Sequence, residues 1–297
     1  MTITRHFLEI DDLSPEELID VLNRSEIGNP PPYLTRQSVA LLFEKPSTRT
    51  RHSIEAAVTQ LGGNSVYTRP EEVGIDVRET AEDISRTLSA YHSAIAARVF
   101  EHTILERMAS VSKVPVINLL SNESHPVQTL ADLLTIRQEF GSLKGKKIAF
   151  VGDACNVAFS LAIGATMVGA NFVVAHPEKY GFDVNDNLKF ASRNIQIEST
   201  TKCEMAVSNA DVIYTDSWYA MGQEDEAEQR RIDFIDYQVN DDLMKLAPEH
   251  AIFMHCLPAH RGEEATNSVL DGPQSRIWQQ AENRLHSMRG LLSVLLG

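Results

Sequence analysis

The run Val39-Ala40-Leu41-Leu42-Phe43, followed after three residues by Ser47-Thr48-Arg49-Thr50-Arg51, decides the fold of this chain. The apolar run predicts a buried strand, and the apolar spacing that follows predicts a helix from Ser53 to Leu61. Helix N-termini carry unpaired N–H groups and partial positive charge, and Ser, Thr and Arg side chains add donors. The segment therefore predicts a phosphate site, although a simple N-cap with solvated arginines is an open alternative.

Composition limits the class of protein. The chain has 297 residues, of which 43% are hydrophobic and 23% charged, which is enough for two globular domains. The N-terminal residues 1–6 lack an apolar signal core, and no segment approaches about 18 uninterrupted apolar residues, so we expect no membrane insertion and a cytoplasmic location. The net charge of −14 disfavours nucleic acid as a partner. Three widely spaced cysteines predict no disulfide framework.

Helical and strand-like segments alternate along both halves of the chain, which predicts parallel βαβ units. The strand-like runs are residues 39–43, 94–99 and 114–118, and then 148–153, 171–175, 211–215 and 251–255. A turn after Gly141 separates the two series. We therefore expect an α/β fold of two doubly wound parallel-sheet domains, residues 1–142 and 143–280. Ligands of such sheets lie beyond the carboxyl ends of the strands, where the polar motifs near residues 47, 98, 125, 153, 216 and 256 are found.

Three further strings accompany Ser-Thr-Arg-Thr in a fixed order: residues 125–128 (His-Pro-Val-Gln), 216–222 (Asp-Ser-Trp-Tyr-Ala-Met-Gly) and 255–258 (His-Cys-Leu-Pro). The ordered set resembles the transcarbamylase family, and within it the ornithine carbamoyltransferases most. The resemblance covers nearly the whole chain, including residues 94–98, 148–153, 258–264 and the late helix that opens at Glu282.

The resemblance implies an enzyme that transfers the carbamoyl group of carbamoyl phosphate to the δ-amine of L-ornithine, giving L-citrulline and phosphate in arginine biosynthesis. It implies a carbamoyl phosphate-binding first domain, an ornithine-binding second domain and an active site in the cleft between them. A C-terminal helix at about 281–297 is expected to pack on the first domain. The resemblance also implies a homotrimer or a multiple of trimers, with no metal and no organic cofactor.

The expected carbamoyl phosphate ligands are Ser47, Thr48, Arg49, Thr50, Arg98, His125, Gln128, Cys256, Leu257 and Arg284. Arg98 ends a strand, so its guanidinium can turn toward a ligand, but an exposed rim arginine is equally consistent with the sequence. An imidazole and an amide at a helix start can hydrogen-bond a carbonyl oxygen and the carbamoyl NH2. A histidine at that position can also be only a helix cap.

The expected ornithine ligands are Asn156, Asp216, Ala220, Met221 and Cys256, and the expected catalytic residues are Arg49, His125, Asp216 and Cys256. Asp216 supplies the negative charge that a diamine substrate needs, whereas an aspartate-using relative needs cationic side chains there. Tyr219 and Ala220 depart from the usual loop of the ornithine enzymes. These departures keep putrescine, or another amine, open as the alternative acceptor.

Rival functions leave weaker signals in the sequence. The strand and turn at Lys147–Gly152 invite a dinucleotide site, but the second and third glycine positions hold Ala154 and Val157. Zinc binding is disfavoured because His255, Cys256 and His260 lack the usual ligand spacing. The alternative to a site role for Cys256 is that it is a small buried apolar residue. A non-catalytic paralogue would have lost Arg49, His125 or Cys256, and none of them is lost.

Overall fold

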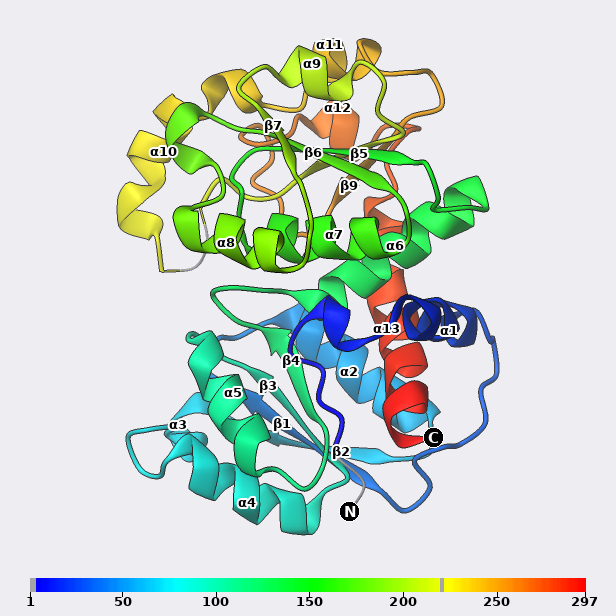
Figure 1. Cartoon of the computed structure of the whole chain (residues 1–297), viewed down its shortest axis with the longest axis vertical. Helices are drawn as coiled ribbons and strands as arrows, with labels where there is room; N and C mark the ends of the chain where they lie inside the picture. Colours follow the sequence, from blue (N-terminus) through cyan, green and yellow to red (C-terminus); the bar gives the residue numbers. More distant parts are fainter. Residues whose placement is uncertain (1–3, 220–221) are drawn as a thin grey trace. The chain divides into compact units, whose positions relative to one another are not determined.

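The structure, a computed structural model, describes residues 4–219 and 222–297. Two compact units divide the chain: Met1–Leu134 with Glu282–Gly297, and Thr135–Ala281 (Figure 1). Each unit is built on one parallel sheet, so the predicted α/β class with two parallel sheets is confirmed. Ala220 and Met221, predicted to bind ornithine, lie outside the described residues. No helix in the described ranges has both the length and the apolar character needed to span a bilayer.

The first sheet has the strand order β2-β1-β3-β4, in which β1 and β3 are neighbours and Phe43 pairs with Arg98. The chain passes from β1 outward to β2 and then returns to the other side of β1, so the topological switch point lies between β1 and β3. Ligands of such sheets bind at this point. The strands are β1 (Ser38–Phe43), β2 (Asn64–Thr68), β3 (Ala94–Arg98) and β4 (Val116–Leu120). The helices of this unit are α1 (Pro15–Ser25), α2 (Thr48–Gln60), α3 (Pro70–Val73), α4 (Ala81–Tyr91) and α5 (His102–Val111).

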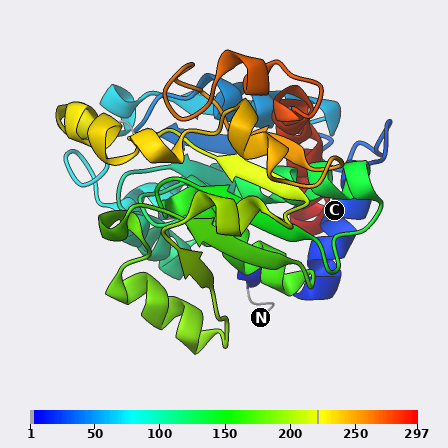
Figure 2. The same cartoon turned by 90° about the horizontal axis from the view of Figure 1, so that it is seen from above.

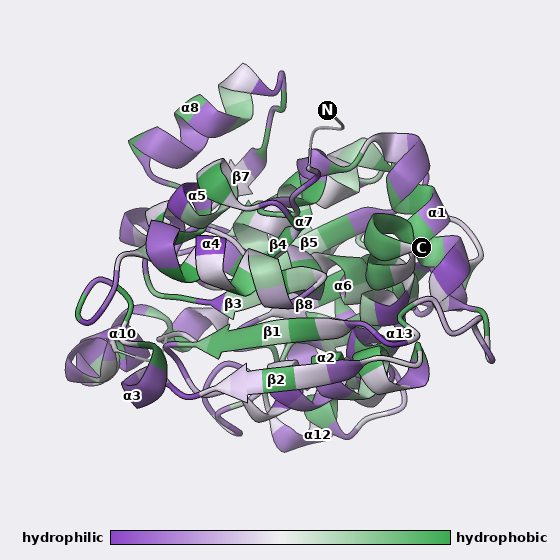
Figure 3. Cartoon of the chain, turned by 90° about the horizontal axis from the view of Figure 1, so that it is seen from below, coloured by the Kyte–Doolittle hydropathy of each residue, from purple (hydrophilic) through white to green (hydrophobic). Residues whose placement is uncertain are grey.

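Alternate residues of these strands face opposite sides of the sheet. Ala40 and Leu42 of β1 share one apolar cluster with Ile95 and Ala97 of β3 and with buried residues of α4 and α5, two helices that lie together in Figure 1. The central strand β1 is buried over residues 39–43, whereas the edge strand β2 is only half-buried. Figure 3 shows the same contrast: hydrophobic colour covers most of β1, whereas β2 is hydrophobic only at its middle and pale to hydrophilic on either side.

The second sheet has the order β7-β6-β5-β8-β9, and its parallel strands run side by side in Figure 2. Its switch point lies between β5 and β8, again where the strand order reverses. The strands are β5 (Lys147–Val151), β6 (Asn171–Ala175), β7 (Glu198–Thr200), β8 (Val212–Thr215) and β9 (Ile252–His255). Its helices are α7 (Asn156–Met167), α8 (Val184–Ser192), α9 (Cys203–Val207), α10 (Ala227–Asp233), α11 (Asp241–Lys245) and α12 (Asn267–Leu270). Two helices continue from one unit into the other: α6 (Pro126–Phe140) and α13 (Ile277–Leu296).

The helix after the first motif begins earlier than the sequence predicts. It starts at Thr48 rather than Ser53, because Ser47 is the N-cap and its side chain accepts a hydrogen bond from the Thr50 N–H at 3.3 Å. The polar segment is therefore the cap and first turn of α2 rather than a separate turn. This change places its donors at the positive end of the helix.

Gly290 brings α13 close to α1 within the first unit. A Cβ at this position would lie 2.3 Å from the Ser25 Oγ and 2.3 Å from the Val21 carbonyl oxygen. We expect Gly290→Ala to lower the free energy of unfolding by about 1–3 kcal/mol, because the added methyl must displace backbone. Gly28→Ala is the control, since a Cβ at Gly28 meets nothing within 4 Å. Equal urea midpoints for the two variants would contradict this account of the packing.

Candidate active site

The N-terminus of α2 presents the Arg49 guanidinium, which has no acidic partner among the described residues. Arg49 lies in its first turn, which contains no acidic residue, and no side chain in residues 4–219 or 222–297 forms a hydrogen bond or ion pair with the Arg49 guanidinium. Arg51, two residues on, is engaged differently: its Nε lies 2.9 Å from Glu55 and its guanidinium stacks 3.6 Å from the centre of the Tyr67 ring. Arg49 is therefore the arginine of this segment that is available to an anion at the helix end.

Arg284 links three helices behind this segment. It is almost fully buried, and it donates from Nη2 to the Thr50 Oγ1 at 3.2 Å and from Nη1 to the Gln128 Oε1. The Gln128 amide in turn donates to Asp132 Oδ1 at 2.8 Å. This network fixes both the Thr50 hydroxyl and the Gln128 amide, because each side chain has a charged or polar partner that sets its orientation.

Arg98 and His125 are both buried, at the end of β3 and just before α6. Burial holds the pKa of His125 well below its usual value, and the charges of Arg284, Arg98 and Arg49 lower this pKa further. The imidazole is therefore neutral around pH 7 and can donate one N–H to a carbonyl oxygen. The same electrostatic coupling shows that the three arginines act on one locality of the first unit.

The lowered pKa of His125 predicts a pH dependence of stability. In the unfolded chain the imidazole takes up a proton below a pKa of about 6.5, whereas in the folded protein it stays neutral. The unfolded state thus binds more protons, and stability is lost as the pH falls from about 7 toward the folded pKa. We expect His125→Asn to flatten the decline of Tm between pH 7 and 5. An unchanged slope would show that this imidazole does not resist protonation.

Directly after β8, the second unit presents the carboxylate of Asp216, which is hydrogen-bonded but has no cationic partner among the described residues. Asp216 Oδ1 accepts hydrogen bonds from the Ser217 N–H at 2.8 Å and the Cys256 thiol at 3.0 Å, and Oδ2 lies 3.8 Å from the Cys155 thiol. No Lys, Arg or His among the residues that the structure describes forms an ion pair with Asp216. Burial raises the pKa of Cys155 well above its usual value, with Asp216 and Asp153 adding to the effect, so this thiol stays protonated and acts only as a donor.

The residues around Asp216 come from the ends of neighbouring strands. Asn156 is the first residue of α7, which follows β5, and Cys155 caps that helix. Leu257 follows Cys256 with a left-handed backbone (φ 60°), and its N–H donates to His255 Nδ1 at 2.9 Å. Two hydrogen bonds hold the turn after β9 against the turn after β8: from the Cys256 thiol to Asp216 and from the Ser217 hydroxyl to the Pro258 carbonyl.

Asp216, His255 and Cys256 also bring possible metal-ligand atoms within 4.8 Å of one another. Both ring nitrogens of His255 are already engaged, however, since Nε2 lies 3.0 Å from Glu264 Oε1 and Nδ1 accepts from Leu257. A metal would have to break this buried pair. The geometry therefore favours a hydrogen-bonding role for the group over metal coordination.

Two family models match nearly the whole chain, and their boundaries inside the chain depart from those of the two units only within the helices α6 and α13 and the residues next to α6. Residues 5–138 match the carbamoyl-P binding domain of aspartate/ornithine carbamoyltransferase, and residues 144–295 match the Asp/Orn binding domain. The chain belongs to the aspartate/ornithine carbamoyltransferase family. The predicted family is thus confirmed, and the chain is a carbamoyltransferase.

Individual carbamoyltransferases are similar over the full length. The "Ornithine carbamoyltransferase" of Pyrococcus abyssi is 46% identical over 306 residues, covering 99% of this chain and 96% of that protein. The "Ornithine carbamoyltransferase, anabolic" of Pyrococcus furiosus is also 46% identical with the same coverage. The solved structure of the ornithine carbamoyltransferase from P. furiosus superposes with a TM-score of 0.93 at 44% identity, over 100% of this chain and 99% of that one.

The structure gathers most of the predicted residues of this carbamoyltransferase into two groups, one on each unit. Thr50, Gln128 and Arg284 are hydrogen-bonded in the first, and Asp216 and Cys256 in the second. Thr48 is exposed on α2, so its hydroxyl is open to solvent. The sequence analysis missed Asp132 and Cys155. Asp132 could have been found from its i+4 spacing to Gln128 on one helix face, and Cys155 from its place beside Asn156 at the end of β5.

Proposed function

We propose that this carbamoyltransferase transfers the carbamoyl group of carbamoyl phosphate to the δ-amine of L-ornithine, giving L-citrulline and phosphate. One observation carries the choice of amino substrate: Asp216, in the unit that matches the Asp/Orn binding domain, is a carboxylate without a cationic partner among the described residues. Such a site attracts an ammonium group and repels the second carboxylate of aspartate. The names of the similar proteins agree with ornithine.

Phosphate is bound, in this proposal, at the N-terminus of α2. The Arg49 guanidinium, the hydroxyls of Ser47, Thr48 and Thr50, and the N–H groups of the helix end neutralise the phosphate, with Arg98 as a second cation. As the bond from the carbamoyl carbon to the bridging oxygen breaks, charge grows on the leaving phosphate. Donors that already point at that position stabilise the transition state without reorganising.

The carbonyl oxygen of the carbamoyl group accepts a hydrogen bond from neutral His125. Gln128, whose orientation Arg284 and Asp132 fix, holds the carbamoyl NH2. Cys256 and Leu257, in the turn after β9, also contact this group in the proposal. An imidazole that stays uncharged polarises the carbonyl without adding a further positive charge to a site that already holds three arginines.

The attacking amine must be neutral, and this is the more demanding step. With a reference pKa of about 10.4, roughly one amine in 10³ is neutral at pH 7, equivalent to roughly 4 to 5 kcal/mol. Asn156 receives the amino-acid end of ornithine, and Asp216 orients its cationic group. Burial and Cys256 favour the neutral δ-amine, which attacks the carbamoyl carbon. The bond from this carbon to the bridging oxygen then breaks, and the proton from the nitrogen leaves with the phosphate.

The finer biological setting is also part of the proposal. We place the enzyme in the cytoplasm, in arginine biosynthesis, as a homotrimer or a multiple of trimers. Support for the biosynthetic direction is the word "anabolic" in the name of the P. furiosus relative. We assign carbamoyl phosphate binding to residues 1–142 with the C-terminal helix, and ornithine binding to residues 143–280, including Ala220 and Met221.

A substrate panel tests the proposed function. Values of kcat/KM are measured at saturating carbamoyl phosphate for ornithine, putrescine, aspartate and acetylornithine. Ornithine should give the highest value, because only it offers both a δ-amine and a free α-amino acid end. A preference of roughly tenfold or more for putrescine, equivalent to about 1.4 kcal/mol, would contradict the assignment of Asn156 and Asp216 to an amino-acid end.

A further inference from the structure

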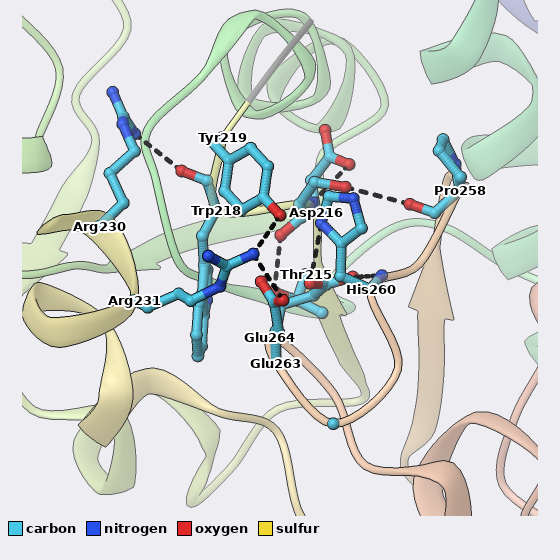
Figure 4. Close-up of polar contacts among 12 residues, drawn as sticks. Thr215, Asp216, Trp218, Tyr219, Arg230, Arg231, Pro258, His260, Glu263 and Glu264 are labelled. Atoms are coloured by element: carbon cyan, nitrogen blue, oxygen red, sulfur yellow. Dashed lines mark hydrogen bonds and ion pairs between the residues drawn. The ribbon is translucent and has the colours of Figure 1, made fainter. Parts of the chain in front are cut away.

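The side chain of Tyr219 contacts His260 and Arg231, two residues that have no role in the proposed reaction. We call this group of three side chains the clasp. The Tyr219 ring stacks on the imidazole of His260, with 4.7 Å between centroids and an interplanar angle of 16°. Its hydroxyl accepts a hydrogen bond from Arg231 Nη2 at 2.8 Å, and the same guanidinium lies 5.3 Å from the centre of the ring. Figure 4 shows Tyr219 between these two side chains.

Both partners of Tyr219 are themselves fixed. Arg231, in α10, forms an ion pair with Glu263 at 3.0 Å, so its charge is neutralised locally and does not compete for Asp216. The backbone N–H of His260 donates to Glu264 Oε1 at 2.6 Å, and Glu264 is fully buried. The clasp therefore connects Tyr219, in the segment after β8, to His260 in the segment after β9 and to Arg231 in α10.

The two residues before Tyr219 are also held by hydrogen bonds. Ser217 Oγ donates to the Pro258 carbonyl at 3.0 Å. Arg230 donates to the Trp218 carbonyl at 2.8 Å (Figure 4) and to Asp153 Oδ2 at 2.8 Å. These contacts fix residues 217 and 218. Tyr219 comes next in the same segment, and its side chain adds the contacts with His260 and Arg231 to those of residues 217 and 218.

We propose that Tyr219 is a positioning residue for the amino substrate, and that its clasp with His260 and Arg231 fixes the segment from Asp216 to Tyr219 in the conformation that receives ornithine beside the Asp216 carboxylate. This inference rests on the proposed function. Preorganising a binding segment lowers the conformational entropy lost on binding, so the clasp strengthens ornithine binding with no direct contact of its own. The clasp does not change the affinity for carbamoyl phosphate, because the main proposed ligands of carbamoyl phosphate lie in the first unit.

Steady-state kinetics of four variants test this inference. An offset aromatic stack contributes enough to change binding by roughly tenfold. We expect Tyr219→Ala and His260→Ala each to raise KM for ornithine by roughly tenfold, while KM for carbamoyl phosphate and kcat change less than about threefold. Tyr219→Phe, which keeps the stack, should stay within about threefold of the wild type. The double variant Tyr219→Ala/His260→Ala should match the single variants, because both remove the same contact.

Tyr91→Ala provides the matched control. Tyr91 also contacts a neighbouring histidine, His92, at 6.4 Å between ring centroids, but it is 70% exposed on α4 in the other unit. This variant should keep wild-type values of KM. A wild-type KM for ornithine in Tyr219→Ala, or effects of Tyr219→Ala and His260→Ala that multiply in the double variant, would overturn the clasp while leaving the proposed function standing. Wild-type enzyme that forms no citrulline would overturn the proposed function and the clasp with it.

If Tyr219→Ala does not fold, His260→Ala and Tyr219→Phe still decide the question. His260→Ala keeps the backbone hydrogen bond to Glu264, so it removes the stack with little disturbance of the segment. A selective rise of KM for ornithine in His260→Ala, absent in Tyr219→Phe, supports the clasp. Equal changes of both Michaelis constants in His260→Ala would instead indicate general damage to the site, and would contradict a positioning role.

Discussion

We expect Arg49→Ala to lower kcat/KM for carbamoyl phosphate by roughly 10²-fold or more and to retain the folded structure. The guanidinium has no partner among the described residues, so its removal leaves no buried group unsatisfied. Its loss removes charge stabilisation of the departing phosphate, an effect that typically costs 10²–10³ in rate. Calorimetric titration with carbamoyl phosphate, together with circular dichroism, measures binding and folding separately.

Arg51→Ala is the matched control for that experiment. Arg51 belongs to the same turn and carries the same charge, but it pairs with Glu55 and stacks on Tyr67. We expect its affinity for carbamoyl phosphate to stay within about threefold of the wild type, since a partly exposed ion pair contributes about 1 kcal/mol or less. Equal losses of affinity in the two variants would show that the segment attracts phosphate by net charge alone.

We expect Cys256→Ser to lower kcat/KM for ornithine by roughly tenfold or more and to change its dependence on pH. For the wild type we expect kcat/KM to rise with pH between about 6 and 8, because the nucleophile must lose a proton whose reference pKa is about 10.4. The thiol donates to Asp216 at 3.0 Å, so its replacement alters the group that lies against the carboxylate proposed to orient the amino substrate. Initial rates across this pH range give the profile.

Two controls separate a chemical role of Cys256 from packing. Cys203→Ser changes a buried thiol whose hydrogen bond goes to the Asp236 carbonyl, and it should leave the pH profile in place. Arg49→Lys should lower the rate without moving the profile, because it acts on phosphate. Wild-type kinetics for Cys256→Ser across the range would show that this cysteine only fills space and that the amine loses its proton by another route.

Local patterns in the sequence predicted most of the strands because most of them are buried apolar runs. The central strands β1, β3, β5 and β8 are buried along nearly their whole length, which is what an apolar run indicates. Two strands were missed: β2 and β7 lie at the edges of their sheets, and their residues are exposed or only half-buried. The edge strands β4 and β9 are buried and were predicted, so it is exposure that hides β2 and β7: a strand without a buried face needs no apolar run, and composition alone does not distinguish it from a loop.

The sequence named candidate site residues, but it did not indicate how their side chains are connected. The bond between Arg284 and Thr50 joins residues far apart in the chain, and no local spacing indicates it. The lowered pKa of His125 likewise depends on arginines from three separate elements. Cys155 was missed because a lone cysteine before a helix has no periodic signal, and its role emerges only when β5 and β8 lie side by side.

Isotope transfer tests the central claim most directly. The enzyme is incubated with carbamoyl phosphate labelled with ¹³C at the carbamoyl carbon and with ornithine, and the products are followed by ¹³C and ³¹P NMR. Our account predicts that the label appears in the ureido carbon of citrulline, with one phosphate released for each citrulline formed, and that Arg49→Ala lowers both rates together. Label that stays in carbamoyl phosphate, or phosphate released without citrulline, would contradict it.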